Sequence, residues 1–68
     1  MLHLITGESI IGTVNVEEIK YITIIEKCHH RPNYVFLIVL KTTEIINVYH
    51  FDRDGAENEI NQLIEESK

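Results

Sequence analysis

The sequence predicts a single α+β domain in which about five antiparallel strands form one strongly bent sheet, a barrel or half-barrel, with one amphipathic helix after it. Two observations predict this class. Short stretches rich in β-branched and aromatic residues alternate with polar breaks from Leu2 to about Phe51. An apolar stripe of helical period then follows. The 68 residues make one domain, 1–68, near the lower size limit for folding alone.

The expected strands are read from the apolar runs and the breaks between them. The break Thr6–Ser9 contains a glycine between two apolar runs, which indicates a hairpin turn. Gly12 lies inside the second run and indicates a bulge or a bend. Pro32 marks a loop, because proline cannot donate to a strand ladder, and Thr42–Glu44 is a tight connection. The expected strands are 1–5, 10–16, 19–25, 34–41 and 45–51.

The helix is predicted over Arg53–Ser67. Asp52 is a favourable N-cap, and Asp54 places negative charge in the first turn, where the helix dipole favours it. Apolar residues then recur at helical spacing and form one stripe that can pack on a sheet. The stripe consists of Ala56, Ile60, Leu63 and Ile64.

The strands carry more apolar surface than one helix can cover. In 34–41, and to a large extent in 19–25 and 45–51, both alternating faces are apolar, whereas a half-exposed antiparallel sheet alternates apolar with polar residues. A helix of about 15 residues is about 22 Å long and covers one face. The second face is therefore buried inside a curled sheet or against another copy of the chain. We expect a curled sheet that also forms a homo-oligomer.

Composition restricts the functional classes. The net charge of −5 argues against broad nucleic-acid binding, which rests on Lys and Arg. Cys28 is the only cysteine, which excludes an internal disulfide and fits a reducing compartment. The longest apolar run, Tyr34–Leu40, is far shorter than the ~20 residues of a membrane span, and 1–6 lacks the features of a signal peptide. We expect a cytoplasmic protein that binds no cofactor and does not associate with a membrane.

The segment Leu4–Val14, with its Gly7-Glu8-Ser9-Ile10-Ile11-Gly12 core, resembles the first signature of Sm-like proteins, and Val39–Val48 resembles the second. The resemblance implies an SH3- or Sm-like bent barrel able to form rings. The chain departs from the family at Lys41-Thr42, where Arg-Gly is expected, and its helix follows the strands instead of preceding them. The resemblance therefore bears on the fold more than on RNA binding.

A second resemblance is to the carbon storage regulator family, through Met1–Leu4, Gly7–Ile10 and the C-terminal helix. It implies an intertwined dimer that binds RNA with arginines. This chain has no arginine before Arg31, so the arginines that carry that activity have no counterpart in its opening strands.

The loop after the third strand holds the residues most able to bind a ligand. Cys28, His29 and His30 offer thiolate and imidazole groups for Zn²⁺, with His3 or His50 as a further ligand, but no paired ligand spacing is present. Lys27 and Arg31 form a local basic patch able to contact an anion, and a solvated loop is the alternative. His50 is expected to be a satisfied core residue, and Glu65 and Glu66 to be exposed.

Two functional hypotheses follow. The first is a non-enzymatic interaction or regulatory module that acts as a homo-oligomer and binds a protein, a type that includes phage-encoded inhibitors of host proteins. The second is nucleic-acid or nucleotide binding by an Sm-like or carbon-storage-regulator-like assembly. Enzymatic activity is not expected, because 68 residues leave little room for a substrate cavity. The candidate contact residues are Lys27, His29, His30, Arg31, Tyr34 and Lys41.

Overall fold

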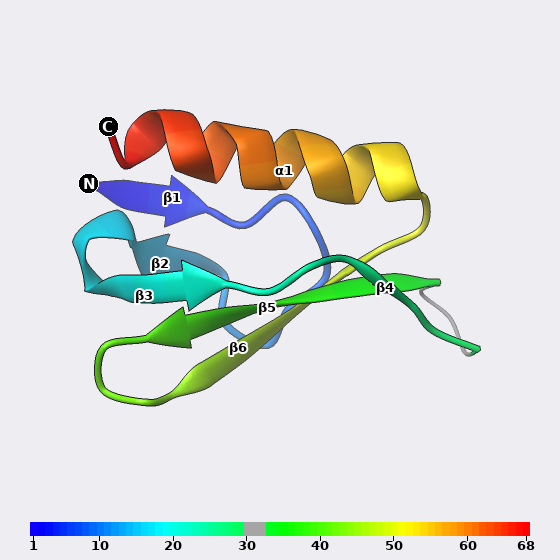
Figure 1. Ribbon diagram of the computed structural model, residues 1–68, viewed down its shortest axis with the longest axis horizontal. Coiled ribbons are helices and arrows are strands. Elements are labelled where there is room, and N and C mark those ends of the chain that lie inside the picture. Colours follow the sequence, from blue (N-terminus) through cyan, green and yellow to red (C-terminus); the bar gives the residue numbers. More distant parts are fainter. Residues whose placement is uncertain (30–32) are drawn as a thin grey trace.

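The computed structural model describes residues 1–29 and 33–68. The predictions at His30, Arg31 and Pro32 lie outside these residues. Six short antiparallel strands form two sheets, and one C-terminal helix follows them (Figure 1). The elements are β1 (Leu2–Leu4), β2 (Thr13–Asn15), a 3₁₀ turn (Val16–Glu18), β3 (Ile19–Ile22), β4 (Glu26–Lys27), β5 (Tyr34–Leu40), β6 (Ile45–His50) and α1 (Arg53–Glu66).

Strand β5 is the centre of the larger sheet. It pairs with β6 on one side and with β3 and β4, one after the other, on its other side. Strands β1 and β2 pair with each other in a separate small sheet. The prediction of one bent sheet of about five strands is corrected to six strands in two sheets, and the described residues form no closed barrel.

The expected strand 19–25 is interrupted for a local reason. The Thr23 hydroxyl oxygen accepts the Leu37 backbone N–H at 2.9 Å, while the Thr23 N–H donates to the Leu37 carbonyl at 2.9 Å. The Thr23 hydroxyl thus accepts a hydrogen bond that a backbone carbonyl accepts in a regular ladder. Regular pairing resumes only at Glu26, opposite Val35. The predicted strand 19–25 is therefore corrected to β3, which ends at Ile22, and β4 lies in the segment that was predicted to be a loop.

The N-terminal hairpin forms within one chain but has a longer connection than predicted. The Ile5 N–H donates to the Gly12 carbonyl at 3.0 Å, so the turn spans 6–11 instead of Thr6–Ser9. Glu8 within it pairs with Tyr49 at the end of β6. The second strand is shorter than predicted, because Asn15 caps a 3₁₀ turn by accepting the Glu17 N–H.

The β5–β6 hairpin and the helix confirm their predictions. The chain reverses at 41–44, where Thr43 adopts a positive φ of 73°. Helix α1 begins after Asp52, whose Oδ1 accepts the Gly55 N–H at 2.7 Å and satisfies one of the free donors of the first turn. The helix ends within one residue of the predicted boundary.

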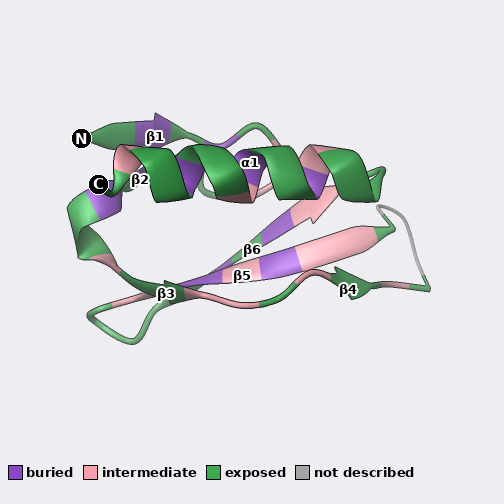
Figure 2. Cartoon of the chain, turned by 45° about the horizontal axis from the view of Figure 1, so that its top comes forward, coloured by how far each residue is buried: buried purple, intermediate pink, exposed green. Residues whose placement is uncertain are grey.

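The core lies between α1, the β1–β2 hairpin and one face of the larger sheet (Figure 2). Ala56 and Leu63 of the predicted stripe are buried and Ile60 is half-buried, whereas Ile64 is exposed. The helix therefore covers one sheet face, as expected. The buried apolar residues of this core are Ile5, Val14, Val16, Phe36, Ile38, Ile46, Val48, Ala56 and Leu63.

The opposite face of the larger sheet, called the outer face below, is mainly apolar and lacks a covering element among the described residues. Because neighbouring side chains alternate along a strand, the residues between the core positions point to this face. Their pairing is Val35 with Tyr49 and Val39 with both Ile45 and Tyr21. Tyr21 and Ile45 are more than half exposed, Val35, Leu37 and Tyr49 are half-buried, and Val39 is buried. The apolar residues of the outer face are Tyr21, Val35, Leu37, Val39, Ile45 and Tyr49, and the polar residues Glu26 and Asn47 lie opposite Val35 and Leu37.

Candidate functional site

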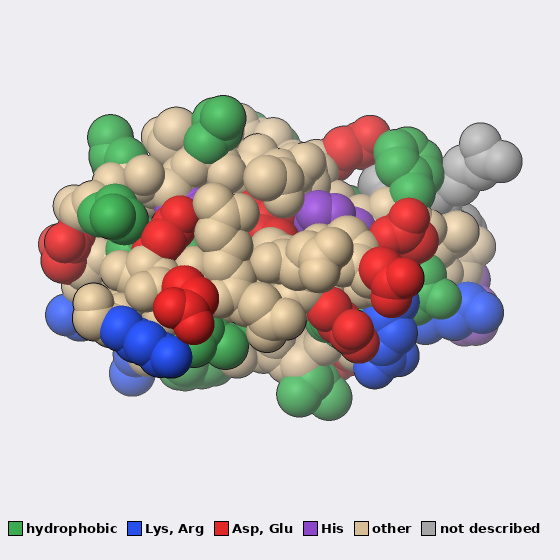
Figure 3. Space-filling view, turned by 90° about the horizontal axis from the view of Figure 1, so that it is seen from above, with side chains coloured by type: hydrophobic (Ala, Val, Ile, Leu, Met, Phe, Trp, Pro, Cys, Tyr) green, Lys and Arg blue, Asp and Glu red, His purple; other side chains and the backbone are tan. Residues whose placement is uncertain are grey.

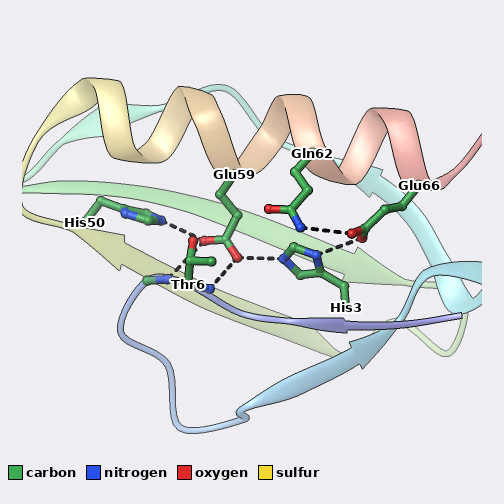
Figure 4. Close-up of polar contacts among 7 residues, drawn as sticks. His3, Thr6, His50, Glu59, Gln62 and Glu66 are labelled. Atoms are coloured by element: carbon green, nitrogen blue, oxygen red, sulfur yellow. Dashed lines mark hydrogen bonds and ion pairs between the residues drawn. The ribbon is translucent and has the colours of Figure 1, made fainter.

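A buried carboxylate, Glu59, lies at the contact between α1, the N-terminal segment and β6 (Figure 4). Glu59 follows Ala56 by three residues and precedes Leu63 by four, so it projects from the apolar side of the helix. Its side chain has no exposed surface. A charged group in such a place must be fully hydrogen-bonded to be tolerated.

Four donors satisfy the Glu59 carboxylate. Oε2 accepts from His3 Nε2 at 2.7 Å and from the Thr6 N–H at 2.8 Å. Oε1 accepts from His50 Nε2 at 2.7 Å and from the Gly7 N–H at 3.1 Å. The network therefore joins β1, the segment after it, β6 and α1 around one side chain.

The network continues from His3 to a second carboxylate. His3 Nδ1 lies 2.8 Å from Glu66 Oε1, and the Gln62 amide donates to Glu66 Oε2 at 3.0 Å. The His3 ring thus lies between two carboxylates of the same helix. The expectation that Glu66 is an exposed charge was wrong, because the His3 ring reaches it from β1.

The hydrogen bonds determine the charge state of Glu59. Burial acts to raise its pKa, but the hydrogen bonds from His3, the Thr6 backbone and His50 outweigh this effect and lower the pKa below the ordinary value. Glu59 is thus held as the anion in the interior. The His50 ring also stacks on Phe36, with ring centroids 6.1 Å apart, which confirms it as a satisfied core histidine.

The same groups in an open cleft would suit acid–base chemistry. Here the side chains of His3 and Glu59 have no exposed surface, and that of His50 is 11% exposed. Their hydrogen-bonding groups contact one another and the backbone, and every buried side-chain polar atom of the described residues has a partner. This arrangement acts as a structural tie between the two ends of the chain.

The predicted contact residues are spread over the molecule. Lys27 lies opposite Tyr34 at the start of β5, whereas Lys41 follows Leu40 at its end. Seven strand residues separate them, which is about 23 Å at 3.3 Å per residue. Lys27, Lys41 and His29 are exposed, and Tyr34 is half-buried. The structure does not bring the two lysines together.

The metal hypothesis depended on Cys28, His29 and His30. Cys28 is a free, half-buried thiol, and His29 is exposed. In the described part of the chain, no group of three or more Cys, His, Asp or Glu side chains is placed to hold a metal ion. His30 lies outside that part, as stated above.

Sequence reasoning missed Glu59 as a site residue. The available indication was its position, because a glutamate at helical spacing from Ala56 and Leu63 falls on the buried side. Its partners were not apparent, since His3 is 56 residues away along the chain. A carboxylate on an apolar helix face predicts a buried donor, but periodicity alone does not identify that donor.

Two surface grooves lie beside the exposed apolar residues. One, of about 280 Å³, lies between the segment Ser9–Ile11 and residues Ile45–Asn47 and Tyr49 of β6. Ile10 on its wall is completely exposed. The other, of about 350 Å³, lies between β3 and the C-terminal half of α1, and Tyr21 and Ile64 contribute to it. The surface over α1 differs from these apolar grooves, because Asp and Glu side chains are spread along it (Figure 3).

Comparison with known proteins identified no relative: no family model, no curated protein and no solved structure matches this chain. Among the described residues, no helix has the length and apolar character needed to cross a bilayer. The function must therefore be argued from the surfaces described above.

Proposed function

We propose that this protein is a non-enzymatic interaction module that binds another protein through the outer face of its larger sheet. The observation that carries the proposal is the outer face itself. Its pairs Val35–Tyr49, Val39–Ile45 and Val39–Tyr21 are apolar, Asn47 and Glu26 lie among them, and α1 and the hairpin pack on the opposite side. Contiguous apolar surface without a covering element on a small protein marks a site of interaction.

The chemistry of the outer face favours a protein over a nucleic acid. Its centre is aliphatic, with Val35, Leu37 and Val39, and tyrosines lie at its margins. Tyrosine is enriched at protein interfaces because it combines a large apolar area with a polar tip. Lys27 and Lys41, two of the predicted contact residues, lie at opposite ends of β5, and the chain carries a net charge of −5. This arrangement does not favour a phosphate backbone.

Affinity capture followed by direct binding tests the proposal. Protein retained by the wild-type chain would be purified and its affinity measured by calorimetry against wild type, Tyr21→Lys and Leu4→Lys. Leu4 is a matched control, because it is an exposed apolar strand residue of the small sheet, away from the outer face. We expect Tyr21→Lys to weaken binding at least tenfold and Leu4→Lys to leave it unchanged.

Two results would contradict the proposal. One is the absence of any protein that binds with measurable affinity. The other is an equal loss in Tyr21→Lys and Leu4→Lys, which would place the contact away from the outer face. Circular dichroism of each variant separates loss of binding from loss of folding.

A further inference from the structure

The larger sheet has one edge that is protected against strand pairing and one that is open to it. Along the β3–β4 edge, the chain has a bulge between Ile19 and Tyr21, a break before Glu26, and lysines at 20 and 27. Natural proteins use these features against the addition of a strand. Strand β6 forms the opposite edge, and its residues 45–49 carry no charge and no proline.

The alternation of the ladder shows which backbone groups of β6 face outward. Tyr49 exchanges both backbone hydrogen bonds with Glu8, at 2.8 and 2.9 Å, so its N–H and C=O point away from β5. Two-residue periodicity then directs the N–H and C=O of Asn47 and Ile45 outward as well. Among the described residues, these four groups have no backbone partner on that side.

The four unpaired groups and the groove beside them fit an extended polypeptide. Donors and acceptors that repeat every two residues, about 7 Å apart, match the repeat of another strand backbone. Sheet edges of this kind bind peptides by adding them as a strand. The groove of about 280 Å³ between Ser9–Ile11 and β6 provides the space. Its walls carry the exposed side chains of Ile10, Ile11 and Ile45, so the added strand needs apolar side chains.

A carboxylate lies at each end of the unpaired stretch. Glu8 is opposite Tyr49 at one end, and Glu44 precedes Ile45 at the other. Both glutamates are exposed, and among the described residues neither forms an ion pair. No basic residue lines the groove. These carboxylates and the net charge of −5 favour a cationic segment and oppose a second copy of this chain.

We propose that the β6 edge binds an extended basic segment of another protein as a further antiparallel strand. The first residue of the segment exchanges both backbone hydrogen bonds with Asn47, and the third residue exchanges both with Ile45. The place opposite Val48 belongs to this chain's own Ser9, which follows Glu8 in its bridge to β6. The segment therefore begins, or turns away from the sheet, before its first paired residue.

The register assigns a side-chain type to each of the four positions. The first residue lies two places along the same line from Glu8 and shares its face of the sheet, so a basic side chain there reaches that carboxylate. The fourth residue lies directly opposite Glu44 and is also basic. The second and third residues lie opposite Ile46 and Ile45 and are apolar. The expected pattern is basic–apolar–apolar–basic.

The inference goes beyond the proposed function and does not rest on it. The outer face would recognise the side-chain surface of a partner, whereas the β6 edge recognises an extended backbone together with its charges. Exposed ion pairs are weak. The backbone hydrogen bonds and the apolar side chains therefore hold the segment, and the two carboxylates select a basic one.

A pair of synthetic peptides with free N-termini tests the site. The probe is Arg-Ile-Val-Arg-amide, and its matched control is Glu-Ile-Val-Glu-amide. Each is titrated into the nitrogen-15-labelled chain at low salt, and the amide shifts are followed by NMR. We expect the arginine peptide to shift the amides of Ile45 and Asn47 and to slow their hydrogen exchange. The glutamate peptide should bind at least tenfold more weakly.

Three variants locate the contact. Asn47→Pro removes an N–H that faces outward, so it leaves the pairing with β5 intact and should weaken binding of the arginine peptide at least tenfold. Glu8→Gln and Glu44→Gln should each weaken it at least threefold and reduce its dependence on salt. Glu57→Gln is the control, because Glu57 is an exposed carboxylate on α1. It should leave the affinity unchanged.

Three results would overturn the inference. They are no binding of the arginine peptide, equal binding of the two peptides, and binding to Asn47→Pro that is as tight as to wild type. Circular dichroism shows whether Asn47→Pro is folded. If it is not, the exposed-carboxylate variants decide, and a loss in Glu8→Gln and Glu44→Gln no larger than in Glu57→Gln overturns the inference.

These outcomes are distinct from failure of the proposed function. A chain that binds no arginine peptide but loses a protein partner in Tyr21→Lys lacks the edge site and remains an interaction module. A chain that binds the arginine peptide at Ile45 and Asn47 but retains no protein on its outer face has the edge site and lacks the proposed function.

Discussion

His3 Nε2 lies 2.7 Å from Glu59 Oε2, and this buried contact joins β1 to a helix that begins 50 residues later. In a domain of this size, apolar burial alone leaves little surplus stability. Glu59 adds a charged acceptor whose four donors come from the N-terminal segment and β6. The network fixes the position of α1 over the sheet and thereby leaves the outer face without cover.

Glu59→Gln is expected to lower the free energy of unfolding by about 2–4 kcal/mol. An amide has one acceptor oxygen, and its NH₂ group must face either the Thr6 N–H or the Gly7 N–H, whichever way it is turned. Two donors would then meet in the interior. Urea unfolding measures the loss.

Glu57→Gln is the control for this substitution. Glu57 is an exposed partner of Arg53 on the same helix, with an N–O distance of 3.2 Å, and such pairs contribute at most about 1 kcal/mol. An equal loss in the two variants would contradict the assignment of Glu59 as the central acceptor.

Acid should destabilise the protein through Glu59. Its pKa in the folded state is lower than the ordinary value of 4.5, so the unfolded chain binds its proton first as the pH falls. The contribution of Glu59 is therefore complete above about pH 4.5 and is lost as the pH falls through the lower folded pKa. Urea midpoints measured from neutral pH downward should fall less for Glu59→Gln than for wild type. Parallel curves would show that Glu59 does not carry this dependence.

The accuracy of the sequence predictions follows the range of the interactions. The Asp52 cap, the apolar stripe of α1 and the reversal at Thr43 depend on neighbours within about one helical or strand turn, and they were predicted. The early end of the strand predicted over 19–25 depends on a bond from Leu37 to the Thr23 hydroxyl, which no local pattern encodes. The apolar count on both faces of 34–41 predicted the outer face, because alternation needs no knowledge of partners.

The polar network could not be predicted from the sequence for a related reason. Glu59 looked like one of several helix glutamates, and His3 like one residue of an apolar strand. Their contact spans 56 residues. Similarly, Lys27 and Lys41 lie apart because Lys27 is opposite the first residue of β5 and Lys41 follows its last residue. The local sequence around each lysine does not indicate this separation.

Gly7→Ala should be strongly destabilising, whereas Gly12→Ala should not. A Cβ at Gly7 would lie 2.5 Å from the Tyr49 carbonyl oxygen and 2.6 Å from His50 Nε2, both fixed by the Glu8 bridge and the Glu59 network. The N-terminal segment must then move away from β6, at a cost of about 1–3 kcal/mol. A Cβ at Gly12 meets nothing within 4 Å, so that substitution should change stability by less than about 1 kcal/mol. Thermal unfolding of the two variants compares them directly. Equal stabilities would mean that the close approach at Gly7 is relieved without disturbing the bridge or the network.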